Sequence, residues 1–166
     1  EFRVVDGEGR NELERAVLGG EPEEKRRAAE TILAMDAPPE LLRKIFWSFP
    51  DGGIAKRAWT KIAKQTVDAT TLEHLLRQVT EPAIAEAAYT RFEALDPTDS
   101  DVSYVMTFVK LQSVKNRAAA RLIARGVSDI EVLDSVLHAC NVAEHQDEAA
   151  RRLLPQAKKG EHFLAI

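Results

Sequence analysis

An alanine recurs every thirty residues along most of this chain, and each one stands in a segment with helical periodicity. The four are Ala28, Ala58, Ala88 and Ala118. Four residues later, one helical turn away on the same face, comes a large apolar side chain. These side chains are Ile32, Ile62, Phe92 and Leu122. The pattern predicts an array of repeats, each beginning with a first amphipathic helix.

A second apolar stripe follows each alanine at offsets of 14, 17, 18 and 21 residues. This is the 0, 3, 4, 7 spacing of the buried face of a helix. Its members are Leu42, Ile45, Phe46 and Phe49; Leu72, Leu75, Leu76 and Val79; Val102, Val105, Met106 and Val109; and Val132, Ser135, Val136 and Ala139. Each repeat is therefore predicted to be a helical hairpin of first helix, turn and second helix.

Prolines and capping residues fall where such hairpins need them. Proline is favoured at the first position of a helix and excluded from its interior. Pro22 and Pro82 are expected to open first helices, whereas Pro38 and Pro97 lie in the turn between first and second helix. Asp68, Thr98 and Ser128 occupy equivalent places in that turn, and Ser128 followed by Glu131 predicts a capping box.

The repeat pattern continues into both ends of the chain. Leu13, Ala16 and Val17 resemble the tail of a preceding second helix that ends at Gly19-Gly20, and Asp51-Gly52-Gly53 is expected to end the next one. Ala149 and Leu153 repeat the first-helix pair one residue out of step, and Phe163 and Ile166 then take second-helix offsets. An array normally closes with a polar outer face. The apolar end therefore predicts that the chain is a fragment of a longer protein.

These boundaries predict one array in three parts. The first part is a segment over residues 1–20 with a partial preceding helix. Four hairpins follow over 21–142, and a partial fifth repeat occupies 143–166. The four hairpins are predicted at 21–51, 52–80, 81–112 and 113–142.

Composition fits a single soluble array. Of 166 residues, 45% are hydrophobic and 30% charged, and no Gly- or Ser-rich linker divides them. Apolar runs fall far short of the roughly 20 residues that a membrane-spanning helix needs. The only cysteine, Cys140, permits no internal disulfide and suits a reducing compartment, so we expect a cytoplasmic protein. Because Cys140 falls at the end of a second helix, we expect a small edge residue rather than a nucleophile.

The first helices resemble a known family. Arg26-Arg27-Ala28-Ala29-Glu30-Thr31-Ile32, Lys56-Arg57-Ala58-Trp59 and Asn116-Arg117-Ala118-Ala119-Ala120-Arg121-Leu122 are similar to the first helix of HEAT-like repeats, in the short form found in phycobilisome lyase subunits. The third repeat departs from the motif at Glu86 and Ala87. The resemblance covers about 21–142 and implies an all-α, right-handed α-solenoid, a superhelix of antiparallel helical hairpins of the HEAT/armadillo-like kind.

Such a fold implies a concave face lined by the second helices. Residues on the side of these helices away from the stripe include types common in protein interfaces. We predict a groove for a protein or peptide centred on Trp47, Arg77, Tyr104 and Phe108. The full predicted set is Lys44, Trp47, His74, Arg77, Gln78, Tyr104, Phe108, Asp134 and His138. In the alternative interpretation Trp47 and Phe108 are buried between repeats, and the groove hypothesis fails if both are inaccessible.

Catalysis is the next class to weigh, because HEAT-like proteins include bilin lyases, a di-iron hydroxylase and DNA glycosylases. The hydroxylase uses repeated His-Glu dipeptides, whereas here the order is reversed and the offsets differ, in Glu73-His74, Glu144-His145 and Glu161-His162. Asp134 and His138 could supply half of a metal site, but an exposed i,i+4 pair is the expected role. We expect no catalytic residue, no cofactor and no metal site.

Nucleic acid binding is disfavoured by the net charge of −4, because phosphate contacts depend on clustered Lys and Arg. The runs Lys25-Arg26-Arg27, Arg151-Arg152 and Lys158-Lys159 are expected on solvated helix faces or loops. The sequence therefore predicts a non-enzymatic interaction scaffold for a protein or peptide. The alternatives are a bilin lyase subunit and, ranked below it, a HEAT-like DNA-binding or glycosylase protein.

Overall fold

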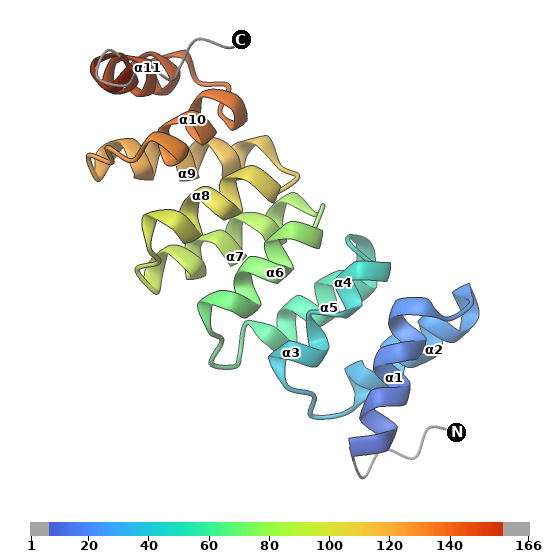
Figure 1. The fold of residues 1–166 in the computed structure, drawn as a ribbon. Coiled ribbons are helices and arrows are strands. Elements are labelled where there is room, and N and C mark those ends of the chain that lie inside the picture. Colours follow the sequence, from blue (N-terminus) through green and yellow to red (C-terminus); the bar gives the residue numbers. More distant parts are fainter. Residues whose placement is uncertain (1–6, 158–166) are drawn as a thin grey trace. The chain divides into compact units, whose positions relative to one another are not determined.

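A computed structural model describes residues 7–157, and within that range the chain is all-α, with helices and no strand (Figure 1). The helices are α1 (Gly7–Gly19), α2 (Pro22–Ala34), α3 (Pro39–Leu42), α4 (Ile45–Ser48), α5 (Gly52–Ile62), α6 (Ala69–Gln78), α7 (Pro82–Ala94), α8 (Asp99–Phe108), α9 (Gln112–Ala124), α10 (Ile130–Ala139) and α11 (Ala143–Ala157). None of the described helices is long and apolar enough to cross a membrane.

The chain divides into two compact units, unit 1 (Glu1–Leu95) and unit 2 (Asp96–Ile166), and each is described by itself. The array as a whole, its three-part division and its superhelical form therefore stay predictions. The predicted positions at Phe163 and Ile166, the Glu161-His162 dipeptide and the Lys158-Lys159 run lie outside the described residues.

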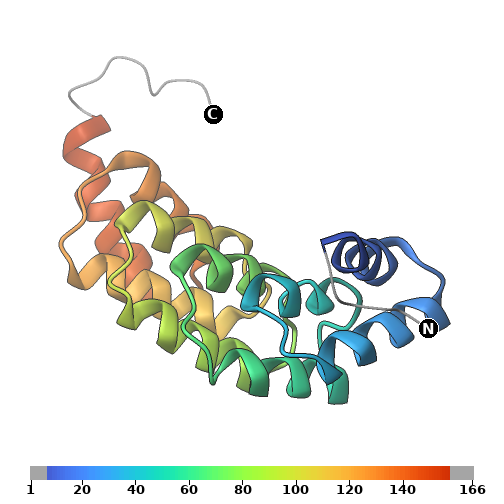
Figure 2. The same cartoon turned by 90° about the horizontal axis from the view of Figure 1, so that it is seen from below.

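Within each unit the helices pack in two layers (Figure 2). In unit 1, α4 contacts both α1 and α6, while α2 packs on α5. In unit 2, α8 packs on α10 and α9 on α11, and α8 also contacts α9 as α10 contacts α11. Second helices thus neighbour second helices, and first helices neighbour first helices.

The core consists of the residues that the thirty-residue pattern selects. The four repeat alanines and their apolar partners Ile32, Ile62, Phe92 and Leu122 are all 0% exposed. Every member of the second stripe is also buried except Phe49, Ser135 and Ala139, which are half-buried. An alanine at each first-helix contact lets neighbouring helices approach closely, and the large partner fills the space one turn away.

Two expectations about helix boundaries are wrong. The second helix of the first repeat is broken at Arg43 and Lys44 into α3 and α4, where the Lys44 and Trp47 amides donate to carbonyls three residues back, at 3.1 and 3.2 Å. These i to i−3 bonds wind the chain more tightly than an α-helix. Gly52 and Gly53 begin α5 instead of ending a helix, and Gly52 has a φ of 75°, which glycine adopts without steric cost.

The predicted capping box at Ser128 and Glu131 is also wrong. Asp129 caps α10, and its carboxylate accepts a bond from the Val132 amide at 3.1 Å. Aspartate caps a helix as well as serine does, so the helix begins one residue later than expected. The capping box is found in α8 instead, between Thr98 and Asp101.

A recurrent polar contact joins successive first helices within each unit. A basic side chain three residues after the repeat alanine donates to carbonyl oxygens at the end of the preceding first helix. Lys61 donates to Met35 (2.8 Å), Arg91 to Ile62 and Gln65 (3.0 and 2.8 Å), and Arg152 to Ile123 and Val127 (3.2 and 3.3 Å). These oxygens lie at or just beyond a helix end, where carbonyls lack an intrahelical partner and the helix dipole favours a cation.

A second contact recurs one helical turn further on. Gln65, Arg125 and Gln156 stand seven residues after an alanine of the repeat and donate to the backbone oxygens of Ala37, Pro97 and Ser128, at 3.0, 2.9 and 2.8 Å. Donor and acceptor are 28 residues apart in all three. We call both sets of contacts the carbonyl clamps. Their donors stand at fixed distances in sequence from the buried alanines.

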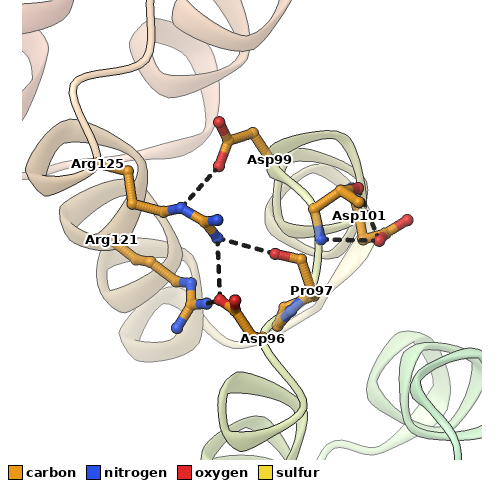
Figure 3. Close-up of polar contacts among 7 residues, drawn as sticks. Asp96, Pro97, Asp99, Asp101, Arg121 and Arg125 are labelled. Atoms are coloured by element: carbon orange, nitrogen blue, oxygen red, sulfur yellow. Dashed lines mark hydrogen bonds and ion pairs between the residues drawn. The ribbon is translucent and has the colours of Figure 1, made fainter.

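In unit 2 the clamp residue Arg125 also belongs to an ion-pair cluster at the N-terminal end of α8 (Figure 3). Arg121 binds the Asp96 carboxylate at 2.9 Å, and Arg125 lies 3.5 Å from Asp96 and 3.2 Å from Asp99. Asp96 has a φ of 50°, a left-handed conformation that costs a non-glycine residue energy. The two arginines hold this turn and so fix where α8 begins.

Arg91→Ala tests the clamps. Loss of the guanidinium leaves the Ile62 and Gln65 carbonyls without this donor, so we expect the free energy of unfolding of unit 1 to fall by about 2 kcal/mol. Both tryptophans, Trp47 and Trp59, lie in unit 1, so tryptophan fluorescence in a urea titration follows that unit.

The matched control is Arg57→Ala. Arg57 also lies on a first helix, but it pairs with Glu30 at an exposed site, where such pairs contribute about 0.5 kcal/mol. Equal losses for the two variants would contradict a special role for the clamp.

Candidate functional site

The predicted interface residues are divided between the two units. Unit 1 carries Lys44 and Trp47 beside or within α4, and His74, Arg77 and Gln78 in α6; unit 2 carries Tyr104 and Phe108 in α8, and Asp134 and His138 in α10. Because each unit is described by itself, a single groove through all of these residues stays a prediction.

In unit 1, Trp47 is the exposed residue of the set. Its side chain is 58% exposed, so the alternative in which it is buried between repeats is wrong. Lys44 is half-buried and pairs with Glu14 of α1, while Arg77 and Gln78 are half-buried. Trp47 is therefore the member of the predicted set in unit 1 that exposes a large apolar surface.

His74 is held in a cationic environment. Its Nδ1 is buried without a hydrogen-bond partner among the described residues. Burial lowers the pKa of His74, and the nearby Arg43 and Arg77 lower it further, against a smaller opposing effect of Asp68. The pKa of Asp68 is itself lowered, chiefly because its carboxylate accepts the Thr71 amide at the start of α6. The neutral imidazole is thus the form that the fold favours.

This environment predicts a pH dependence of stability. Since the His74 pKa is lower in the folded chain than the roughly 6.5 of an unfolded one, the unfolded state binds more protons and the free energy of unfolding falls as pH drops below about 6.5. His74→Gln should flatten this dependence between about pH 7.5 and 5.5, as measured by urea titration with circular dichroism.

His138→Gln is the matched control, since His138 lies on the exposed face of α10. If its profile flattened as much as that of the His74 variant, the assignment to His74 would be wrong.

A concavity of unit 2 lies between α8 and α10. It has a volume of 460 Å³, and we call it the α8–α10 groove. Its lining comes from α8 on one side and from α10 with its preceding turn on the other: Asp99, Ser100, Ser103, Tyr104, Thr107, Phe108, Val127, Asp129, Glu131, Val132 and Ser135. Tyr104 and Phe108, both predicted from the sequence, are thus in the groove.

An aromatic pair forms part of the α8 wall. The rings of Tyr104 and Phe108 have centroids 4.6 Å apart and are tilted by 52°. Phe108 is 48% exposed and Tyr104 is half-buried, so the buried alternative is wrong for Phe108 as well. Rings that are exposed in part keep apolar area for a contact with another molecule.

Two hydroxyl groups in the groove are already used as donors. The Thr107 hydroxyl donates to the Ser103 carbonyl and the Ser135 hydroxyl to the Glu131 carbonyl, each at 2.9 Å and four residues back in its own helix. A hydroxyl whose proton is engaged in this way retains only acceptor capacity. Thr107 and Ser135 therefore offer acceptors to a ligand.

Three carboxylates line the groove. Asp99 lies 3.2 Å from Nε of Arg125 and is neutralised by it. Asp129 caps α10, and Glu131 follows it in the first turn. Neither Asp129 nor Glu131 forms an ion pair within residues 7–157, and both are exposed. These two carboxylates give the groove a negative charge.

A second hollow of 310 Å³ adjoins the groove, since Thr107 and Ser135 line both. It also includes Lys115, Asp134, His138 and Ala139. The ring of His138 lies 3.4 Å from the Asp134 carboxylate, and both side chains are exposed. Across the described part of the chain, no three His, Cys, Asp or Glu side chains are grouped so that they could hold a metal.

Cys140 lies at the end of α10 and is buried. Its Sγ accepts the Val142 amide at 3.3 Å and lies 3.6 Å from the Asn116 side-chain oxygen. The thiol thus contacts α9 and the turn that leads into α11.

Unit 1 has hollows of different character. One of 440 Å³ between α1 and α2 is lined by Glu12, Arg15, Ala16, Gly19, Gly20 and Glu24. One of 230 Å³ is lined by Pro22, Glu23, Lys25, Arg26, Ser48 and Phe49. Neither hollow is lined by a pair of aromatic side chains, so the α8–α10 groove is the better candidate site.

Sequence reasoning missed the second wall of this groove. Asp129, Glu131 and Ser135 line the groove opposite α8 because α10 packs on α8. The spacing of residues in the sequence does not indicate which faces of two helices lie opposite each other. One signal was present: Ser135 stands where the other repeats carry Ile45, Leu75 and Val105. A hydroxyl in a buried stripe indicates that the stripe is open to solvent there.

Comparison with protein-family models gives no match, and comparisons with curated proteins and with solved structures give none either. The family resemblance therefore depends on the repeat residues themselves.

Proposed function

We propose that the chain is a HEAT-like repeat protein, a right-handed α-solenoid that acts as a non-enzymatic interaction module. The fold part is supported by contacts that recur with the thirty-residue period. Apolar core positions repeat within both units, and so do the carbonyl clamps between successive first helices. Hairpins that bury each other's faces in this way are the units of solenoid proteins.

The binding part is supported by the α8–α10 groove. Its aromatic pair is exposed in part, Thr107 and Ser135 offer polar acceptors, and its walls are the helices α8 and α10. A site of this kind, with an apolar anchor point and a polar rim, has the composition of protein interfaces. The exposure of Phe108 beside Tyr104 within the groove is the observation that carries the proposal.

The ligand that fits is a peptide segment of a protein partner. α8 has ten residues and so is about 15 Å long, a length that matches about ten helical or five extended residues of a peptide. Ser100, Asp129 and Glu131 are exposed at the start of the two helices, and Thr107 and Phe108 are exposed at the end of α8, so the groove is open to solvent at both ends. A longer chain can enter and leave such a site at both ends.

Phe108→Ala is the test. We expect peptides of about 12 residues, selected from a displayed random library on the intact chain, to bind this variant at least about tenfold more weakly, because a hot-spot aromatic contributes more than about 1.4 kcal/mol. Fluorescence anisotropy of a labelled selected peptide measures the dissociation constant.

Leu154→Ala is the control in the same unit, since Leu154 on α11 is 61% exposed and lies outside the groove lining. Trp47→Ala reports on unit 1. Peptides that lost affinity with Leu154→Ala or Trp47→Ala but not with Phe108→Ala would contradict the proposed site.

A further inference from the structure

We infer that the α8–α10 groove takes a basic peptide whose Lys or Arg side chains lie against Asp129 and Glu131; the inference rests on the proposed peptide-binding function. Three independent features of the groove support a cationic ligand: its charge, its hydrogen-bonding capacity and its aromatic rings.

The charge comes from the two carboxylates without an ion pair. Every charged residue that lines the groove is acidic, and of these carboxylates only Asp99 has an ion-pair partner among the described residues, which is Arg125. Asp129 stands at the N-cap and Glu131 within the first turn of α10, so both lie at one end of the groove. Surface pairs are weak singly but steer partners of opposite charge and exclude those of like charge.

Four groups of the groove can only accept hydrogen bonds. Thr107 and Ser135 donate their protons to carbonyls of their own helices, and the ionised carboxylates of Asp129 and Glu131 have no proton to donate. A ligand that binds these four groups must therefore supply the donors. Lysine and arginine carry three and five donor hydrogens and no acceptor, which makes them the side chains best matched to this wall.

The aromatic pair favours the same ligands. The face of a tyrosine or phenylalanine ring attracts a guanidinium or ammonium group within roughly 6 Å of its centre. The partly exposed rings of Tyr104 and Phe108 can also pack on the aliphatic stem of Lys or Arg. A side chain with an apolar stem and a cationic head thus contacts the rings and the carboxylates together.

The adjoining hollow, beyond Thr107 and Ser135, has a mixed lining of Lys115, His138 and Asp134. The groove carboxylates that have no ion pair among the described residues, Asp129 and Glu131, lie together at the other end. We expect the basic residues of bound peptides to cluster in one part of their sequence rather than spread along it.

The experiment compares library selections on the native chain and on the double variant Asp129→Asn, Glu131→Gln. Asparagine caps a helix as well as aspartate, so this variant removes charge while it keeps the cap and the shape of the groove. Glu144→Gln with Asp147→Asn, on the exposed face of α11, is the matched control of equal charge change.

We expect peptides selected on the native chain and on the control to be enriched in clustered Lys and Arg, and those selected on the groove variant to lose this enrichment. A basic selected peptide should bind the groove variant about fivefold to tenfold more weakly, and the control within about twofold. Its affinity for the native chain should also fall between about 0.05 and 0.5 M salt.

Peptides that require Phe108 but are not basic, or that bind the groove variant unchanged, would overturn this inference and leave the proposed function standing. Failure to select any peptide that depends on Phe108 would overturn the proposed function, and the inference with it.

Discussion

The contact on which the repeats depend is the bond from a basic side chain of one first helix to the carbonyl oxygens at the end of the previous one. Arg91 and Arg152 each reach two such oxygens, 25 to 29 residues back along the chain. Apolar burial holds the helices together but is not directional. The clamps supply direction, because a hydrogen bond to a carbonyl oxygen is short and weakens steeply as its angle departs from linear. They therefore set how far one first helix can slide along the next.

The same principle positions the groove. In unit 2 the clamp residue Arg125 also pairs with Asp96 and Asp99, and Arg121 of the same helix binds Asp96. Both carboxylates lie at the start of α8. The turn at Asp96 and Pro97 is thereby fixed against α9 (Figure 3). This turn leads directly into α8, the helix that carries Tyr104 and Phe108. A contact that stabilises the fold thus also sets the geometry of the candidate site.

Much of the fold was predictable from the alanine spacing, because a helix that buries one face needs apolar residues at helical spacing along that face. The clamps were not, since lysine, arginine and glutamine share the donor role and the acceptors belong to the backbone. The break at Lys44 and the cap at Asp129 depend on which of two alternative hydrogen bonds forms, and the alternatives differ by only one or two residues in position. For the site, exposure of Trp47 and Phe108 agreed with the groove hypothesis, whereas Glu131 and Ser135 required knowledge of which helices are neighbours.

Each clamp has a backbone oxygen as its acceptor, so only its donor depends on the identity of a side chain. A substitution at Met35, Ile62 or Gln65 leaves the acceptor in place, so one repeat can change its sequence without a compensating change in the next. A hairpin in which the basic residue three positions after the alanine reaches these oxygens, as Lys61, Arg91 and Arg152 do, thus supplies the donor for its own contact with the preceding hairpin. Neighbouring hairpins can then diverge in sequence independently while their joint is retained.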